Sequence, residues 1–140
     1  SLLLKSFSLT QYVYIAEHLG LQPLNPWLNV FLDFDHGANY AIPGATALAS
    51  LTPFALAKQI SWHLDLVGEV YNRSSPSDAA EPRKRLPTVQ ALHDALYVIQ
   101  IGGIDYRTYY LDLHYPPELV GDTIVPLVVE EIRVGLEVLT

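Results

Sequence analysis

Apolar residues recur every three or four positions in three stretches of the chain, which is the spacing of a helix with one buried face. The first stretch starts after Ser8, a residue type that favours helix N-termini, and stops at Gly20, which favours C-termini. The pattern predicts a helix over residues 8–20. Its expected apolar face consists of Tyr12, Ile15, Ala16 and Leu19.

Two further stretches predict longer helices. The second helix is expected to begin with Thr52 as its cap and Pro53 in its first turn. Its expected apolar face consists of Phe54, Ala57, Ile60, Leu64, Val67 and Tyr71. The last helix is expected over about residues 124–139 from apolar residues at four-residue steps. Pro126 is compatible with it, because proline is tolerated in the first turn of a helix. Its expected apolar face consists of Ile124, Val128, Ile132 and Leu136.

A run of strand-forming residues, Ala95–Ile101, ends at Gly102 and Gly103. Because this run is apolar on both faces, it predicts a central strand of a covered parallel sheet. A short helix is expected before it, around residues 88–94. Residues 22–27 predict a proline-rich turn, and residues 29–50 predict a structured loop followed by the start of a small-residue helix. Helix, strand and helix in this order predict an α/β fold with a crossover connection.

Residues 72–87 have almost no apolar side chains and contain three prolines. They predict a long surface loop inside one domain or, alternatively, a domain boundary. The basic run Arg83–Arg85 lies in this loop and is expected to be solvated. Asn72 opens an N-x-S triplet with Ser74, which accepts a glycan if the chain passes through the secretory route.

Composition narrows the classes of function. Half of the 140 residues are hydrophobic, enough to bury a core, and the net charge of −7 argues against a nucleic-acid or anionic-membrane partner. No apolar run approaches the roughly 20 residues of a membrane-spanning helix. The chain has no cysteine, which excludes disulfides and thiolate sites within it. It also has no methionine, so we expect its start to be a truncation or a processed end.

In sheets of parallel strands, ligands bind at loops beyond the carboxyl ends of the strands. Residues 102–106 form the loop in that position here. Two glycines allow a sharp turn with exposed amides, and Asp105 is suited to hold the loop by accepting amide hydrogen bonds. From the residues alone, an active-site loop and a purely structural turn remain equally open.

Two stretches resemble sequence blocks of the plant GDSL esterases. Residues 36–47, HGANYAIPGATA, are similar to the second block, commonly written GANFA followed by GGATA-like residues. Residues 97–106, YVIQIGGIDY, are similar to the third block, an apolar strand followed by GGNDY. Three flanking pieces resemble the family as well: residues 15–21 (IAEHLGL), 59–62 (QISW) and 125–129 (VPLVV). The chain thus resembles the middle portion of a plant-type GDSL esterase/lipase, in the SGNH hydrolase superfamily.

The resemblance implies a three-layer α/β/α fold with a parallel sheet, incomplete in this chain, so that residues 1–140 are a partial hydrolase domain. It implies hydrolysis of carboxylic esters through a serine acyl-enzyme, with the nucleophile, the His and its Asp outside these residues. The implied partners are a small-molecule or lipid ester substrate and the remaining segments of the same hydrolase. No cofactor or metal is expected. The expected location is secreted, or alternatively vacuolar.

The family's two oxyanion donors align with two positions of this chain. Gly44 matches the second-block glycine, whose backbone N–H stabilises the tetrahedral oxyanion. Ile104 occupies the position of the third-block Asn, whose side-chain amide is the other donor, and isoleucine has no such group. Loss of one donor costs on the order of 100- to 1000-fold in turnover. The residues expected to support the site loops are Gly102, Gly103, Asp105 and Asn39.

No residue of this chain is assigned as a nucleophile. Ser50 and Ser61 fall on predicted helices and Ser74 in the polar loop, none of them in the strained strand-to-helix turn that a nucleophilic serine needs. Asp112 and His114 have the wrong spacing for the family's Asp-x-x-His pair and are expected in a surface turn.

The remaining histidines predict no zinc site, because none has a matching ligand four residues away. His18, His63 and His93 fall on predicted helices. His36 lies in the second-block loop, where we expect a hydrogen-bonded structural role rather than a place in a substrate pocket.

Two alternatives to an active esterase remain. In the first, the protein is a catalytically impaired relative that keeps the scaffold as a binding or storage protein. In the second, it is an acyltransferase that uses the same residues with an alcohol in place of water.

Overall fold

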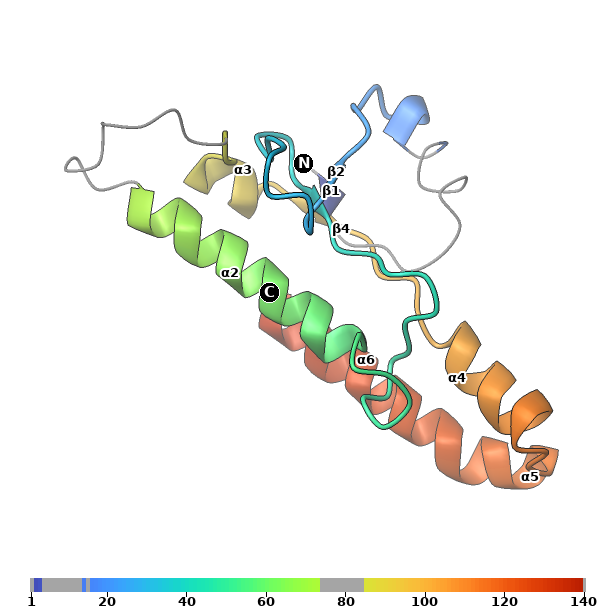
Figure 1. Ribbon diagram of the computed structural model, residues 1–140. Helices are drawn as coiled ribbons and strands as arrows, with labels where there is room; N and C mark the ends of the chain where they lie inside the picture. The colour runs from blue at the N-terminus through green and yellow to red at the C-terminus, as the bar shows by residue number, and fades with distance from the viewer. Residues whose placement is uncertain (1, 4–13, 15, 74–84, 140) are drawn as a thin grey trace.

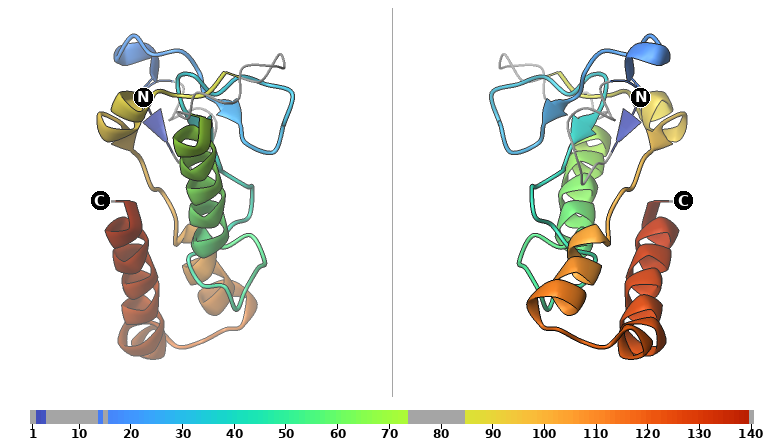
Figure 2. Two further views of the ribbon diagram at one scale, coloured as in Figure 1. Left: turned by 90° about the vertical axis from the view of Figure 1, so that its left-hand side faces the viewer. Right: turned by 90° about the vertical axis from the view of Figure 1, so that its right-hand side faces the viewer.

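The structure, a computed structural model, describes residues 2–3, 14, 16–73 and 85–139. Its frame is a pair of helices, α2 (Leu56–Arg73) and α6 (Val125–Leu139), which lie side by side (Figures 1 and 2). They approach closely where Gly135 faces α2. A Cβ at Gly135 would lie 2.8 Å from Ile60 Cδ1 and 3.2 Å from Leu56 Cδ2, so a larger residue here would have to displace these side chains.

Helix α2 confirms the predicted second helix but not its predicted face. Its buried residues are Leu56, Gln59, Ile60, Trp62, His63, Leu66 and Val70. Among the residues expected to be buried, Phe54, Ala57, Leu64 and Tyr71 are exposed. The predicted face was out of register, because apolar residues lie on several sides of α2 and spacing alone does not show which side packs. The buried side includes the apolar Trp62 and Leu66, together with Gln59 and His63, which have hydrogen-bond partners of their own.

Helix α6 is the end of a longer helical segment, formed by α5 (Pro117–Leu119) and the π-helical turn η2 (Val120–Ile124). Ile124 and Val128 are buried as predicted. Leu136 is exposed instead, and Gly135 takes the buried place beside α2. The predicted face drifted because a step of four residues overshoots the 3.6 residues of a helical turn.

Strand pairing among the described residues consists of two short parallel ladders. β1 (Leu2–Leu3) pairs with β4 (Leu96–Tyr97), and β2 (Asn25–Pro26) pairs with β3 (Ala38–Asn39). The predicted strand at residues 95–101 is therefore paired over two residues only, and Leu96 is exposed. Full cover on both faces was a wrong prediction for these residues, none of which is fully buried, because the faces of a parallel sheet are covered by packed helices and not by the apolar character of the strand itself. Helices with parallel pairing agree with an α/β class, and the three-layer arrangement stays a prediction.

The segment before β2 ends a helical turn at Gly20. Gly20 has a φ of +66°, and its N–H bonds to the Glu17 carbonyl, which confirms this glycine as a helix end. Ala16 is buried as predicted, whereas Leu19 is exposed. The other residues of that predicted face and its cap lie outside the described residues: Ser8, Tyr12 and Ile15.

The loop that follows β3 remains non-helical up to α2. The predicted small-residue helix start was wrong, because residues 43–54 form turns and bends. Thr52 Oγ1 accepts the Phe54 N–H at 3.3 Å in one of these turns, and the helix itself begins at Leu56. Proline at position 53 and the hydroxyl of Thr52 therefore shape a turn rather than a helix cap.

The short helix predicted around residues 88–94 is confirmed as α3 (Val89–His93), where the Thr88 side chain accepts the Ala91 N–H as the N-cap. The polar loop predicted from residue 72 begins later, since Asn72 and Arg73 are the last residues of α2. Residues 74–84, including Arg83 and Lys84, lie outside the described residues.

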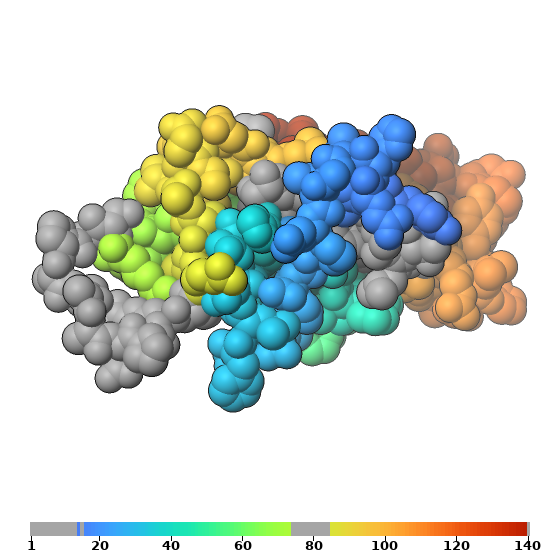
Figure 3. Space-filling model, turned by 90° about the horizontal axis from the view of Figure 1, so that it is seen from above, coloured from blue at the N-terminus to red at the C-terminus, as the bar shows by residue number. Residues whose placement is uncertain are grey.

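Arg85 is exposed as the sequence predicted, and it also joins the loop of residues 25–40. Its N–H and Nε donate to the Asp33 carboxylate at 2.6 and 2.9 Å, and its Nη1 lies 3.3 Å from Asp35 Oδ2. The Phe34 N–H in turn donates to the Arg85 carbonyl at 2.7 Å. Figure 3 shows the yellow residues after position 84 resting against the blue-to-cyan loop.

Two clusters of buried side chains lie on either end of α2. The first is rich in aromatic rings, which include Trp27, Phe34, Tyr40 and Trp62. The second joins the turn before α2 to η2 and α6 through Ala47, Leu48, Val120, Ile124 and Val128. Helix α4 (Gly103–Arg107), which continues into the π-helical turn η1 (Thr108–Asp112), lies beside this second cluster.

Candidate functional site

The second-block turn (residues 44–48) and the third-block turn (residues 102–105) are joined by Asp105. Its side chain is fully buried, and its two carboxylate oxygens accept the N–H groups of Ala47 at 2.8 Å and Leu48 at 2.9 Å. The bonded residues are 58 and 57 positions apart in the chain. We expected Asp105 to hold its own loop, and it instead binds the two loops to each other.

Gly44 opens the second-block turn with its backbone exposed. Its φ is +80°, a left-handed conformation that side chains rarely adopt, and a Cβ built there would meet nothing within 4 Å. Glycine is therefore required by the backbone conformation and not by crowding. Among the described residues the Gly44 N–H has no hydrogen-bond acceptor, so this amide is available to a ligand in the space beside it.

Gly102 and Gly103 differ in their surroundings. Gly102 is buried with a φ of +102°, and a Cβ there would lie 3.2 Å from the side chain of Val128. Gly103 is exposed at the first position of α4. Gly102 thus lets the chain turn sharply against α6, and the turn leads directly into the helix that carries Asp105.

Ile104 lies between Gly103 and Asp105 on the first turn of α4 and is half-buried. Its side chain is purely apolar, so it offers no hydrogen bond to a negatively charged oxygen. The described part of the chain therefore brings one exposed backbone donor, at Gly44, into the turn that Asp105 ties to this helix.

Asn39 supports the second block at a different point. Its side-chain Oδ1 accepts the Ala41 N–H at 3.0 Å, and its backbone carbonyl accepts the Trp27 N–H at 2.9 Å. The residue fixes the loop between β3 and Gly44 by a local turn of the kind that Asn commonly makes. Nothing in these contacts gives Asn39 a direct chemical role.

Curated relatives match the chain over most of its length. It is 36% identical over 100 residues to a GDSL lipase of Tanacetum cinerariifolium. The matched region covers 69% of this chain and 25% of that protein. It is 30% identical over 141 residues to acetylajmalan esterase 2 of Rauvolfia serpentina, covering 87% of this chain and 36% of that protein. It is also 28% identical over 125 residues to the inactive GDSL esterase/lipase-like protein 25 of Arabidopsis thaliana, a match that covers 89% of this chain and 26% of that protein.

The chain belongs to the plant-type GDSL esterase/lipase family. It spans about a quarter to a third of the length of these relatives. No family profile and no solved structure matches it. The relatives include proteins named as esterases and one named as inactive, so membership of this GDSL family fixes a hydrolase ancestry without fixing an activity.

The structure also places the serine, aspartate and histidine residues considered as catalytic groups. Asp112 and His114 are exposed at the end of η1, as expected for a surface turn. Ser50 lies in a turn and not in the predicted helix, and Ser61 on α2 donates its hydroxyl to the Lys58 carbonyl. Ser74 lies outside the described residues.

His36 is exposed, with its Nε2 3.8 Å from Asp35 Oδ2, and it lines a surface hollow of about 390 Å³ together with Asp33 and Arg85. The structural role expected for His36 stays a prediction. Among the described residues, no group of three or more His, Cys, Asp or Glu side chains is placed to hold a metal ion. Nor is any described helix long and apolar enough to cross a membrane.

Sequence reasoning missed one buried polar contact. His63 is buried, and its Nδ1 lies 3.4 Å from the hydroxyl of Tyr40, which is itself fully buried. Burial lowers the pKa of His63 to about 4, and burial also raises the pKa of Tyr40. The available signal was the spacing of Gln59, His63 and Leu66, which share one helix face.

Proposed function

We propose that this chain supplies the oxyanion-binding part of a serine carboxylic ester hydrolase. The observation that carries the proposal is the Asp105 junction, which ties the exposed Gly44 amide to the helix of the third block. In this role the Gly44 N–H stabilises the negative oxygen of the tetrahedral intermediate. The serine nucleophile and the His with its Asp come from segments of the protein outside these residues.

Asp105 acts in this proposal as a positioning residue. It touches no substrate, but its two hydrogen bonds fix the backbone between Gly44 and Leu48 relative to α4. A backbone donor contributes most when it is held in place before the charge develops, because no energy is then spent on reorienting it. Burial strengthens the arrangement, since water does not compete for the carboxylate.

The substrate is proposed as a small-molecule or lipid ester, and the complete protein as a three-layer α/β/α hydrolase. A secreted location, with a vacuolar one as the alternative, accompanies this proposal. Asn72 supports it as a glycan acceptor because it is exposed on the last turn of α2. An intact mass that exceeds the sequence mass and falls in Asn72→Gln would support glycosylation.

Ile104 supports the second candidate, a catalytically impaired binding or storage protein. Without an amide at this position, one of the family's two side-by-side donors is missing, and one relative is named as inactive. An acyltransferase would use the same groups and differ only in the accepting alcohol.

Hydrolysis of short-chain p-nitrophenyl esters by the complete protein, with and without Ile104→Asn, tests the proposal. The restored amide is expected to raise turnover by about 100- to 1000-fold. Leu111→Asn, which adds an amide to an exposed position of η1, is the matched control and should leave turnover unchanged.

An active wild type whose rate is the same in Ile104→Asn would show that Ile104 does not stand at an oxyanion position. Absence of turnover in both proteins would favour the binding or storage alternative over the hydrolase.

A further inference from the structure

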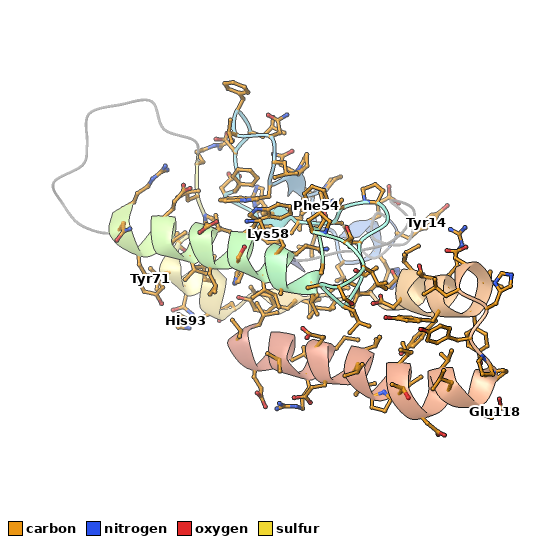
Figure 4. All side chains as sticks on the ribbon, turned by 60° about the horizontal axis from the view of Figure 1, so that its bottom comes forward. Tyr14, Phe54, Lys58, Tyr71, His93 and Glu118 are labelled. Carbon is orange, nitrogen blue, oxygen red and sulfur yellow. The ribbon has the colours of Figure 1, made fainter. Side chains whose placement is uncertain are left out.

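A pocket of about 510 Å³ lies between α2, α3, β4 and the end of α6. Its walls are mainly apolar and include Leu64, Val67, Leu92 and Leu139. Figure 4 shows Tyr71 of α2 and His93 of α3 on the same side of the molecule, and both belong to its lining. The volume is within the range of small-molecule sites, roughly 300–1000 Å³.

The most deeply buried polar group in the lining is the ring of His63, and Tyr71, His93 and Tyr97 also line the pocket. His63 is 3% exposed, and its Nδ1 faces the Tyr40 hydroxyl, which does not line the pocket. Tyr97, which does line it, meets the His63 ring edge-on at 5.3 Å between ring centres. The ring therefore lies between the aromatic cluster on one side and the pocket on the other.

The state of the His63 ring follows from these neighbours. Burial lowers the pKa of His63 to about 4, so the imidazole is neutral at pH 7 and carries one N–H. In the tautomer whose Nδ1 accepts the hydrogen of the buried Tyr40 hydroxyl, the N–H is on Nε2. Among the described residues, Nε2 has no hydrogen-bond acceptor. In that tautomer, Nε2 is a donor on a ring that lines the pocket.

We infer that this pocket binds an uncharged, largely apolar small molecule with one oxygen that accepts a hydrogen bond from His63 Nε2. The lining holds no Lys, Arg, Asp or Glu side chain, so neither a carboxylate nor an ammonium group finds a charge partner there. A medium-chain ketone or alcohol has the required chemistry.

This pocket is separate from the Gly44 turn. Tyr97 lines it at the start of the segment that runs from β4 to Gly102, whereas the Asp105 junction lies beyond the end of that segment. Along α2, the pocket is lined from His63 onward, and the second-block turn meets the helix at Leu56, whose N–H bonds to the Thr46 carbonyl. The inference does not depend on the proposed hydrolase activity.

Titration of the full chain with 2-heptanone, followed by NMR of histidine side-chain nitrogens and tyrosine rings, tests the inference. The ketone is expected to shift the signals of His63, Tyr71 and Tyr97 saturably and to leave those of His18 unchanged. His63→Phe keeps an aromatic ring but removes the donor, and should weaken binding by about tenfold, the effect of one hydrogen bond.

Val67→Trp fills the pocket without removing His63 and should abolish the shifts, while His93→Ala at the rim should change the affinity less than His63→Phe. Unchanged His63 signals up to the solubility limit of the ketone would overturn the inference. So would equal shifts at His18, or binding that survives Val67→Trp in the folded protein.

Discussion

Two carboxylates in this molecule make nearly the same contacts in opposite surroundings. Asp105 accepts the backbone N–H groups of Ala47 and Leu48, and Asp33 accepts the backbone N–H and the Nε of Arg85. Each pair joins segments more than 50 residues apart. Asp105 is 0% exposed, whereas the side chains of Asp33 and Arg85 are 38% and 70% exposed.

The difference teaches that burial, more than geometry, sets the value of such a contact. At Asp33 water replaces any lost partner, and salt screens the charges. At Asp105 neither happens, so removal of the carboxylate leaves two buried amides without acceptors. The same reasoning indicates which contact positions the candidate site and which one only tethers a surface loop.

Replacement of Asp105 by alanine should give the largest effect. We expect a loss of about 3–5 kcal/mol in the free energy of unfolding, because two buried donors each lose a charged acceptor. Urea unfolding measures it. Asp105→Asn, which keeps one acceptor oxygen, should lie between wild type and Asp105→Ala, and equal midpoints for all three proteins would contradict the buried junction.

The buried base His63 should give a smaller, pH-dependent effect. Its pKa is about 4 in the folded chain against 6.5 when unfolded, so the unfolded chain binds more protons between these values. Stability is therefore fully present above about pH 6.5 and falls as the pH drops towards 4. We expect a loss of about 2 kcal/mol, because Nε2 faces the pocket and water screens part of the effect.

Urea midpoints measured from pH 7.5 to pH 4 in wild type and His63→Phe isolate this contribution, since acidic residues and the other histidines affect both proteins alike. An equally steep decline in the two proteins would assign the acid sensitivity to other groups.

Removal of the exposed pair should give the smallest effect. Arg85→Ala is expected to change the unfolding midpoint little, and the small change should shrink further in high salt. A loss as large as that of Asp105→Ala would show that exposure does not distinguish these two contacts.

The sequence predicted the helices better than their faces. Helical spacing located α2 and α6, and the short helix expected around residues 88–94 was found as α3. The face of α6 failed at Leu136, because a four-residue step drifts from the helical repeat, and the face of α2 failed at Tyr71, because spacing alone does not show which apolar side of the helix packs. The strand at residues 95–101 is only briefly paired, since pairing depends on segments distant in the chain.

For the candidate site, the two blocks were found by their motifs, and Asp105 was recognised as an acceptor. Its partners, Ala47 and Leu48, could not be read from spacing because they lie in the other block. The contact between His63 and Tyr40 was missed because the two residues are 23 positions apart, although the face that Gln59, His63 and Leu66 share indicated the burial of His63.

Amide hydrogen exchange at residues 44–48 tests the central claim most directly, because it reports each N–H separately. If Asp105 holds the second-block turn, the amides of Ala47 and Leu48 exchange slowly, at rates near those of the α2 core, while the Gly44 amide exchanges fast. Exchange of Ala47 and Leu48 as fast as that of Gly44 would contradict the account.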